Sequence, residues 1–279
     1  MRTIILILLF NFLSFPQTFL YERSFGDFEN ASSFYINPVG YIFVTDIDTD
    51  EIYVLDTLGN MIHSIGGYGW SNSAFDSPVD IFADALTIFV ADKNNHRIQR
   101  FDKNLNFIFQ VSTRESEIEE QSFGYPLSAV TSNLGDIFIL DSENSRIIKF
   151  DLFGNFLQNF GGYNYGNYSM QQPKQLAVSM QNNIFVIDNN QIIIFDAYGN
   201  GIGKAEGNEN FISIRIIFNW LTVCTEDKIY LANLKYPDLN IKEVILEGVD
   251  YNPGIVSAIV FNSKLYVLCK NNILVFNRM

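Results

Sequence analysis

The sequence predicts an all-β protein, a six-bladed β-propeller of four-stranded antiparallel blades closed by an N-terminal outer strand. Three observations lead to this prediction. A pair of strand-forming segments recurs along the chain, glycine-containing turns follow several of these pairs, and the two ends of the chain hold complementary parts of one repeat. No helical periodicity is visible in the 279 residues, of which 48% are hydrophobic.

The recurring unit joins two β-forming segments through a polar turn. In its clearest copies each segment ends in Asp, as in residues 88–92 and 98–102. The first segments end at positions 46, 92, 141, 188, 225 and 269, so successive copies are 46, 49, 47, 37 and 44 residues apart. A four-stranded propeller blade repeats every roughly 40–50 residues. Six copies therefore predict six blades.

The turns agree with this arrangement. Gly-Asn pairs follow the second Asp of three copies, at Gly59, Gly154 and Gly199. Glycine adopts positive φ without steric cost, as tight hairpins require. We expect these positions to join the third and fourth strands of their blades.

The two ends of the chain supply one blade between them. At the C-terminal end only two residues follow Asn277, so the last copy lacks an outer strand. At the N-terminal end residues 19–26 precede the first copy and resemble the outer strands expected at 61–66 and 156–161. We expect the N-terminal segment to complete the last blade. Such an exchange closes the ring and leaves no free sheet edge there.

Residues 1–17 are predicted to be an export signal, which leaves residues 18–279 for the propeller. Arg2 precedes a continuous apolar run from Ile4 to Phe10, which is shorter than the roughly 20 residues that span a bilayer. The alternative is a buried first strand. Export predicts a secreted or periplasmic protein, in which Cys224 and Cys269 are expected to be buried, free thiols.

The charge of the chain limits its partners. Eighteen Lys and Arg residues face 31 Asp and Glu residues, for a net charge of −13. Binding to phosphate backbones or anionic membranes needs clustered basic residues, so we expect neither nucleic acid nor a membrane surface as partner.

Residues 92–102, with the step Asn95-His96-Arg97, resemble the NHL repeat. Residues 141–151 are similar but have Ser145 in place of the histidine. The first copy departs from the motif with Glu51 in place of the arginine, and the fourth to sixth copies have a shorter turn. The resemblance implies a six-bladed propeller that binds a partner on one face, and it implies no single chemistry.

The recurring aspartates Asp46, Asp92, Asp141 and Asp188 have a structural and a chemical interpretation. We expect each to accept hydrogen bonds from its own turn and, where the motif is complete, to pair with the Arg five residues on. Asp46, Asp48 and Asp50 alternate along one turn and form a weak candidate Ca²⁺ site, although an EF-hand would need Gly and Glu where Glu51 and Thr57 stand. A solvated acidic turn is the alternative, and no other cofactor is predicted.

The chain has two histidines, His63 and His96. A zinc site with three His ligands is therefore excluded, and no Ser or Cys nucleophile can be paired with either histidine from the sequence.

Two glycine-rich loops carry the candidate binding residues. Residues 66–70 and 161–168 are expected to join outer strands to the next inner strands, on the side of the ring where the Asp-bearing turns lie. Aromatic residues on such loops suit stacking on sugars or packing on peptides, and covering the seams between blades is the alternative. The candidates are Tyr68, Trp70, Tyr163, Tyr165 and Tyr168.

The sequence thus predicts an exported, monomeric, non-enzymatic module that presents a loop face to a protein or glycan. The alternative is a Ca²⁺-dependent lactonase or related hydrolase with carboxylates at the central channel. Convergence of Asp or Glu side chains from different blades at the channel mouth would distinguish the two.

Overall fold

A computed structural model describes residues 7–8, 17–236, 241–249 and 254–279, and the predicted export signal lies almost wholly outside them. The described chain is all β apart from one short 3₁₀ helix, Gly166–Tyr168. Among these residues, no helix has the length and apolar character needed to cross a membrane.

Hydrogen bonding divides the strands into five sheets. The first four-stranded sheet contains β3 (Ala31–Ile36), β4 (Ile42–Asp46), β5 (Glu51–Leu55) and β6 (Met61–Gly66). The second contains β7 (Pro78–Ala83), β8 (Thr87–Asp92), β9 (Arg97–Asp102) and β10 (Phe107–Val111). The third is β11 (Ser128–Thr131), β12 (Ile137–Asp141), β13 (Arg146–Phe150), β14 (Phe156–Phe160). The fourth, β15 (Pro173–Val178), β16 (Ile184–Asp188), β17 (Gln191–Phe195), β18 (Gly201–Glu206), gains β1 (Ile7–Leu8) as a parallel neighbour of β18.

The fifth sheet has eight strands in the order β19-β20-β21-β22-β2-β25-β24-β23. Its members are β19 (Ser213–Ile217), β20 (Trp220–Cys224), β21 (Ile229–Asn233), β22 (Lys242–Glu247), β23 (Ile255–Phe261), β24 (Lys264–Cys269), β25 (Ile273–Arg278) and β2 (Gln17–Phe25). The strands β19 and β23 therefore lie at the two ends of one continuous sheet.

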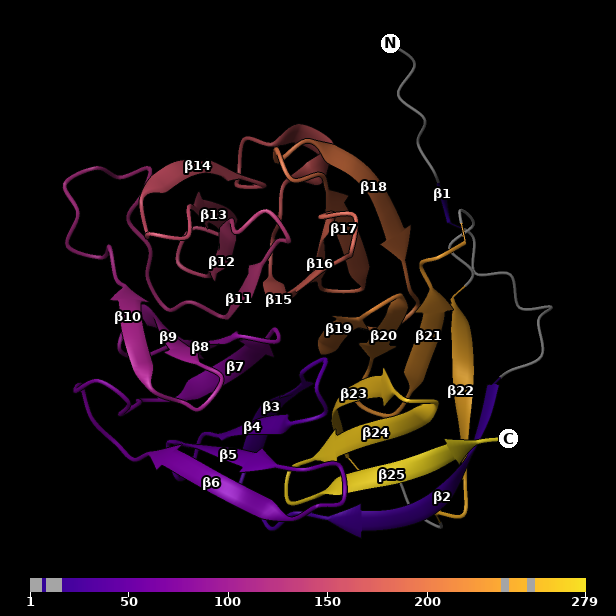
Figure 1. The fold of residues 1–279 in the computed structure, drawn as a ribbon. Coiled ribbons are helices and arrows are strands. Elements are labelled where there is room, and N and C mark those ends of the chain that lie inside the picture. Colours follow the sequence, from indigo (N-terminus) through magenta and orange to yellow (C-terminus); the bar gives the residue numbers. More distant parts are fainter. Residues whose placement is uncertain (1–6, 9–16, 237–240, 250–253) are drawn as a thin grey trace.

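The sheets are arranged as the blades of a propeller. Figure 1 shows β3, β7, β11, β15, β19 and β23 around the centre, with β6, β10, β14, β18 and β2 toward the outside. Each of these inner strands contacts the next, and β23 contacts β3, so the ring closes on itself. The all-β propeller and its four-stranded blades are confirmed.

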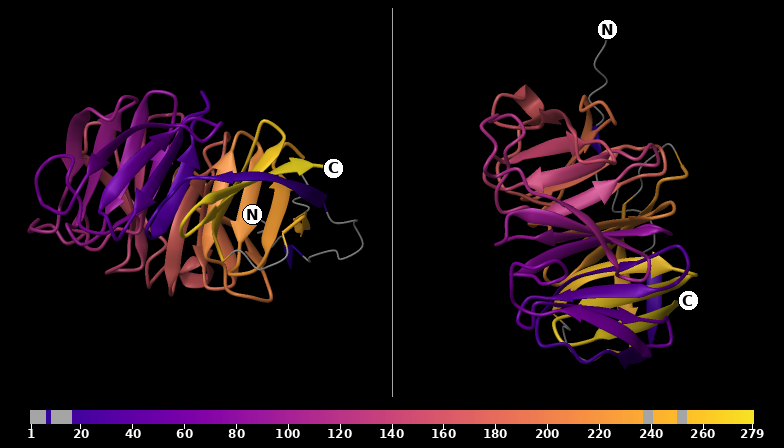
Figure 2. Two further views of the ribbon diagram at one scale, coloured as in Figure 1. Left: turned by 90° about the horizontal axis from the view of Figure 1, so that it is seen from below. Right: turned by 60° about the vertical axis from the view of Figure 1, so that its left-hand side comes forward.

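Strand β2 joins the N-terminal segment to the end of the chain, as the sequence predicts. It pairs antiparallel with β25 from Phe19↔Arg278 to Phe25↔Ile273. It also pairs in parallel with β22 from Gln17 to Leu20, which the sequence analysis did not foresee. Figure 2 shows the indigo β2 crossing beside the yellow C-terminal strands.

The hydrophobic core lies between neighbouring blades. The second strands β4, β12 and β16 are buried at every residue because blades cover both of their faces, which explains why they read as continuous apolar runs. Cys224 and Cys269 are free and buried in one cluster of this core, as expected. Burial raises the pKa of Cys224 to about 12 and that of Cys269 to about 11.

The glycine turns have the predicted geometry. Gly59, Gly154 and Gly199 have φ values of 96°, 84° and 85°. The Asp that opens each turn accepts backbone hydrogen bonds from the turn and one from the Asn four residues on, as Asp56 does from Asn60. These hydrogen bonds, the Asn60 side chain first, lower the pKa of Asp56.

Candidate functional site

The recurring aspartates attach their turns to the loops that enter the same blade. The carboxylate of Asp46 accepts backbone N–H bonds from Glu29 and Asn30 at 2.7 and 3.0 Å, and that of Asp188 accepts them from Gln171 and Gln172. All four repeat aspartates are buried. Hydrogen bonds from their own turns are confirmed for Asp46, Asp92 and Asp141, and the arginine partners for Asp92 and Asp141. Asp188 instead binds the preceding loop.

The three acidic residues of the first turn serve separate donors. Asp46 binds the backbone, Asp48 accepts from the side chain of Asn30 at 3.1 Å, and Asp50 accepts from the backbone N–H of Ser77 at 2.7 Å. Desolvation raises the pKa of Asp50. Among the described residues, no group of three or more His, Cys, Asp or Glu side chains is placed to hold a metal. Calcium binding at this turn stays a prediction.

Arg97 holds the loop of residues 67–77. It is 4% exposed, and its Nε donates to Asp92 at 2.7 Å, so the expected ion pair forms. The rest of the guanidinium donates to the backbone carbonyls of Trp70, Ser71 and Ala74 at 2.8–3.0 Å, and to Gln110. One buried side chain thus fixes the backbone of a whole surface loop. Arg146 similarly binds Asp141 and the carbonyls of Glu119 and Ser122 in the loop of residues 112–127.

The aromatic side chains of the first loop point away from the protein. Tyr68 is 74% exposed and Trp70 is 67% exposed. Phe75, at the other end of the loop, is fully buried against Phe101 and anchors it. The loop therefore presents two large exposed aromatic side chains on a backbone that Arg97 and Phe75 fix in place.

The second aromatic loop divides into exposed and packed residues. Tyr163 is 86% exposed, whereas the hydroxyl of Tyr165 donates to the carbonyl of Gly199 at 2.9 Å. Tyr168 packs against Phe195 with ring centroids 6.1 Å apart, and its ring lies where a side chain at Gly201 would have to be. The structure therefore places Tyr165 and Tyr168 over the edge of a blade, and Tyr163 in solvent.

A third loop on this side, residues 112–127, packs against His96 of the turn between β8 and β9, in a histidine cluster that the sequence did not predict. Nδ1 of His96 accepts hydrogen bonds from the backbone N–H of Tyr125 and from the side chain of Arg114, both at 3.0 Å. The ring centroids of His96 and Tyr125 lie 4.2 Å apart. Because Nδ1 is an acceptor, this arrangement requires the neutral imidazole with its proton on Nε2. We call the side of the ring that carries the loops 67–77, 112–127 and 161–172 the loop face.

The histidine cluster makes stability depend on pH. Desolvation, followed by the charge of Arg114, lowers the pKa of His96 below its ordinary value of 6.5. The stabilisation that neutral His96 gives the folded state is therefore complete above about pH 6.5. It is lost as the pH falls toward the lowered pKa, since the unfolded chain binds the proton first.

Melting temperatures measured from pH 7 to pH 5 should fall less for His96→Asn than for the parent. Asn tolerates the φ of 52° at this position. An unchanged slope in His96→Asn, with His63→Asn as control, would contradict the assignment.

The central channel contains a layer of buried polar residues. One comes from each inner strand: Ser33, Asp80, Ser128, Gln175, Ser213 and Ser257. Asp80 is the hub of this channel layer and accepts hydrogen bonds from Ser33 at 2.8 Å, Ser128 at 2.5 Å and Gln175 at 2.9 Å.

A buried ion pair completes the channel layer. Nη2 of Arg215 lies 2.7 Å from Asp80 and also donates to Ser33, and both charged side chains are 2% exposed. Arg215 lies over the ring of Tyr35 at 5.6 Å, and its Nε has no partner among the described residues. This network was not predicted from the sequence, although a polar residue in each inner strand is a signal of it.

Comparisons with known proteins agree with this architecture. No family model matches the chain. It is 33% identical over 144 residues to Protein brain tumor of Drosophila melanogaster, and 32% identical over 143 residues to B-box type zinc finger protein ncl-1 of Caenorhabditis elegans. Each match covers 50% of this chain but only 13% and 16% of those proteins, respectively.

Solved structures resemble almost the whole chain. A streptogramin B lyase superposes with a TM-score of 0.65 at 14% identity, covering 92% of this chain and 97% of the lyase. Virginiamycin B lyase from Staphylococcus aureus has a TM-score of 0.60 at 11% identity, covering 89% and 95%. At these identities the likeness shows the β-propeller fold alone.

Proposed function

We propose that this protein is an exported, non-enzymatic binding module whose loop face takes a protein or glycan partner. The observation that carries the proposal is Trp70, two-thirds exposed on a loop whose carbonyls are fixed by the buried Arg97. A loop that is already ordered loses little conformational entropy on binding. Trp and Tyr are also the residue types most enriched among residues that dominate binding energies.

Two features support binding rather than hydrolysis. The four repeat carboxylates lie in their own turns, so they do not gather at the channel. Among the described residues, Asp80 in the channel layer is paired with Arg215, and Asp84 at the channel mouth accepts hydrogen bonds from its own turn. The likeness to lyases is one of fold, and the alternative of a Ca²⁺-dependent hydrolase needs carboxylates at the central channel.

We also propose that the eight-stranded sheet is two blades, which gives a ring of six. Its first half, β19 to β22, and its second half, β23 to β25 with β2, each run from an inner to an outer strand like the other blades. The parallel pairing of β2 with β22 then joins two neighbouring blades at their outer strands. The resemblance of residues 92–102 to the NHL repeat also supports six blades.

Substitution of the exposed aromatics should separate binding from folding. We expect Trp70→Ala and Tyr163→Ala to retain the melting temperature within about 2 °C, because neither side chain is buried. Partner affinity should fall by about thirtyfold for Trp70→Ala, since loss of such a residue costs about 2 kcal/mol or more. Affinity can be measured for the main protein or glycan retained from a periplasmic extract.

The matched control is Tyr198→Ala. Tyr198 is 76% exposed in the turn between β17 and β18, outside the loops that carry Trp70 and Tyr163, so its loss should change neither folding nor capture. Unchanged affinity in both loop variants would refute the proposed binding face. Cell fractionation of the full chain tests export separately, and retention in the cytoplasm would contradict that part of the proposal.

A further inference from the structure

The side of the ring opposite the loop face has a cavity at the mouth of the channel. We call this side the turn face, because it carries the turns that join first to second and third to fourth strands. The cavity has a volume of about 480 Å³, within the range of small-molecule sites. Residues from five consecutive blade segments line it, from Tyr35 in β3 to Phe218 after β19.

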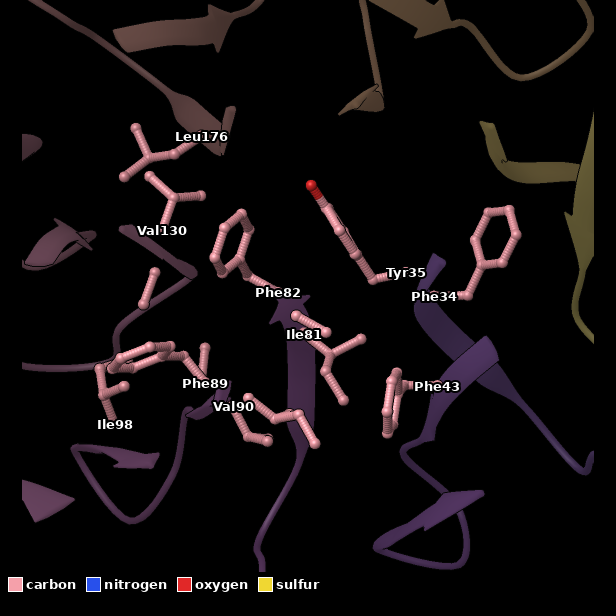
Figure 3. Packing of buried hydrophobic residues seen from close by; sticks show 14 of the residues in the cluster. Phe34, Tyr35, Phe43, Ile81, Phe82, Phe89, Val90, Ile98, Val130 and Leu176 are labelled. Atoms are coloured by element: carbon pink, nitrogen blue, oxygen red, sulfur yellow. The ribbon is translucent and has the colours of Figure 1, made fainter. Parts of the chain in front are cut away.

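The cavity is largely apolar. Tyr35 and Phe82 line it, with ring centroids 5.0 Å apart, and Figure 3 shows both side chains on the same side of their strands, away from Phe34 and Ile81. Exposed apolar side chains surround the opening: Leu86, Leu152, Met180 and Phe218. Such a rim can cover an aliphatic or aromatic ligand.

Among the described residues, Arg100 is the one Lys or Arg that lines this cavity. Its guanidinium lies over the rings of Phe89 and Phe109 at 5.5 and 5.4 Å. Among the described residues, Arg100 forms no ion pair and its Nε has no hydrogen-bond partner. Its one hydrogen bond among them runs from Nη1 to the carbonyl of Leu152 at 3.3 Å. By contrast, the nearby Lys149 is paired with Asp136 at 2.8 Å.

The acidic residue of the cavity, Asp84, is near enough for its negative charge to favour the charged form of Arg100, but it forms no ion pair with Arg100. Asp84 accepts hydrogen bonds from the backbone N–H groups of Leu86 and Thr87, both at 2.7 Å, and from the hydroxyl of Thr87 at 2.9 Å. Its oxygens are thus engaged within its own turn. A guanidinium held on an aromatic platform with donors to spare suits a carboxylate, which it can bind through two hydrogen bonds.

We propose that the channel mouth binds a small carboxylate with an apolar body, the carboxylate on Arg100 and the apolar part against Tyr35, Phe82 and the apolar rim. The site lies on the turn face and is independent of the loop face. The chemistry is shared by free acyl carboxylates and by the C-terminal carboxylate of a short apolar peptide.

Isothermal titration of the full chain with octanoate tests the proposal, and octanol, which has the same chain without the charge, serves as the ligand control. We expect saturable binding of octanoate at one site, at least tenfold tighter than octanol. Arg100→Gln should abolish this preference, and Arg100→Lys should retain part of it. Lys103→Gln removes a positive charge from an exposed turn of the same blade outside the cavity, and it should bind as the parent does.

Titration with N-acetyl-leucyl-leucine and its amide distinguishes the two sources of the carboxylate. Preference for either carboxylate over its neutral counterpart, lost in Arg100→Gln, supports the site. Equal binding of charged and neutral ligands, binding that Arg100→Gln leaves unchanged, or no saturable binding of either carboxylate overturns it. If Arg100→Gln does not fold, the comparison of charged with neutral ligands on the unaltered chain still decides. Trp70→Ala should bind octanoate normally, so failure of the loop-face proposal remains distinguishable.

Discussion

A chain that starts at Asp27 should lose most of its stability, because it lacks β2. This strand pairs with β25 from Phe19 to Phe25 and with β22 through residues 17–20, and Phe19 is 1% exposed. Burial of one Phe contributes about 1.5–3 kcal/mol, and the truncation also leaves the outer edges of β22 and β25 unpaired. We expect a loss of at least about 5 kcal/mol, which lowers the melting temperature of a chain of this size by about 10–20 °C.

Thermal denaturation of purified chains is the measurement. The matched control starts at Gln17 and keeps β2 whole, so it should melt close to the full chain. Phe19→Ala in the longer chain should reproduce part of the effect, about 3–5 kcal/mol. If the chain from Asp27 melts within 2 °C of the chain from Gln17, β2 does not hold the ring closed.

Asp80→Ala should destabilise the protein by about 3–5 kcal/mol, the range for removing one partner of a buried ion pair. The substitution leaves the buried charge of Arg215 uncompensated and removes the acceptor for Ser33, Ser128 and Gln175. Chemical denaturation gives the free energy of unfolding directly.

Two further variants identify the cause. The double variant Asp80→Leu with Arg215→Met removes both charges and should be more stable than Asp80→Ala, because no unpaired charge remains. Asp102→Ala, in an exposed turn, should cost about 1 kcal/mol. Loss of less than 1 kcal/mol in Asp80→Ala would show that the channel layer does not stabilise the fold.

Most of the fold could be predicted because each blade is specified locally. The apolar runs 137–141 and 184–188, the glycine turns and the spare strand at the N-terminus all fall in the structure where the repeat predicts them. The pairing of β2 with β22 could not be predicted, since it depends on where two outer strands from opposite parts of the chain meet.

The candidate site was predicted less completely. Tyr68, Trp70 and Tyr163 are largely exposed, whereas Tyr168 and the 38% exposed Tyr165 contact a neighbouring strand or turn. All five have the same kind of loop context in the sequence. They differ in whether a neighbouring strand covers them, which a single sequence does not reveal. The carbonyl contacts of Arg97 are equally invisible, because they depend on the path of a loop about 25 residues earlier.

The sequence by itself determined the repeat, the strands, the Asp–Arg turns and the closing strand, because these follow from residue periodicity and from contacts within one repeat. Only the tertiary structure decided which side chains meet across the ring. Asp80 and Arg215 are 135 residues apart and come together because closing the ring brings every inner strand to one axis. Equivalent positions of different blades become neighbours there. A polar residue in each inner strand marks the layer along the chain, but which of these residues pair with one another depends on the closed ring.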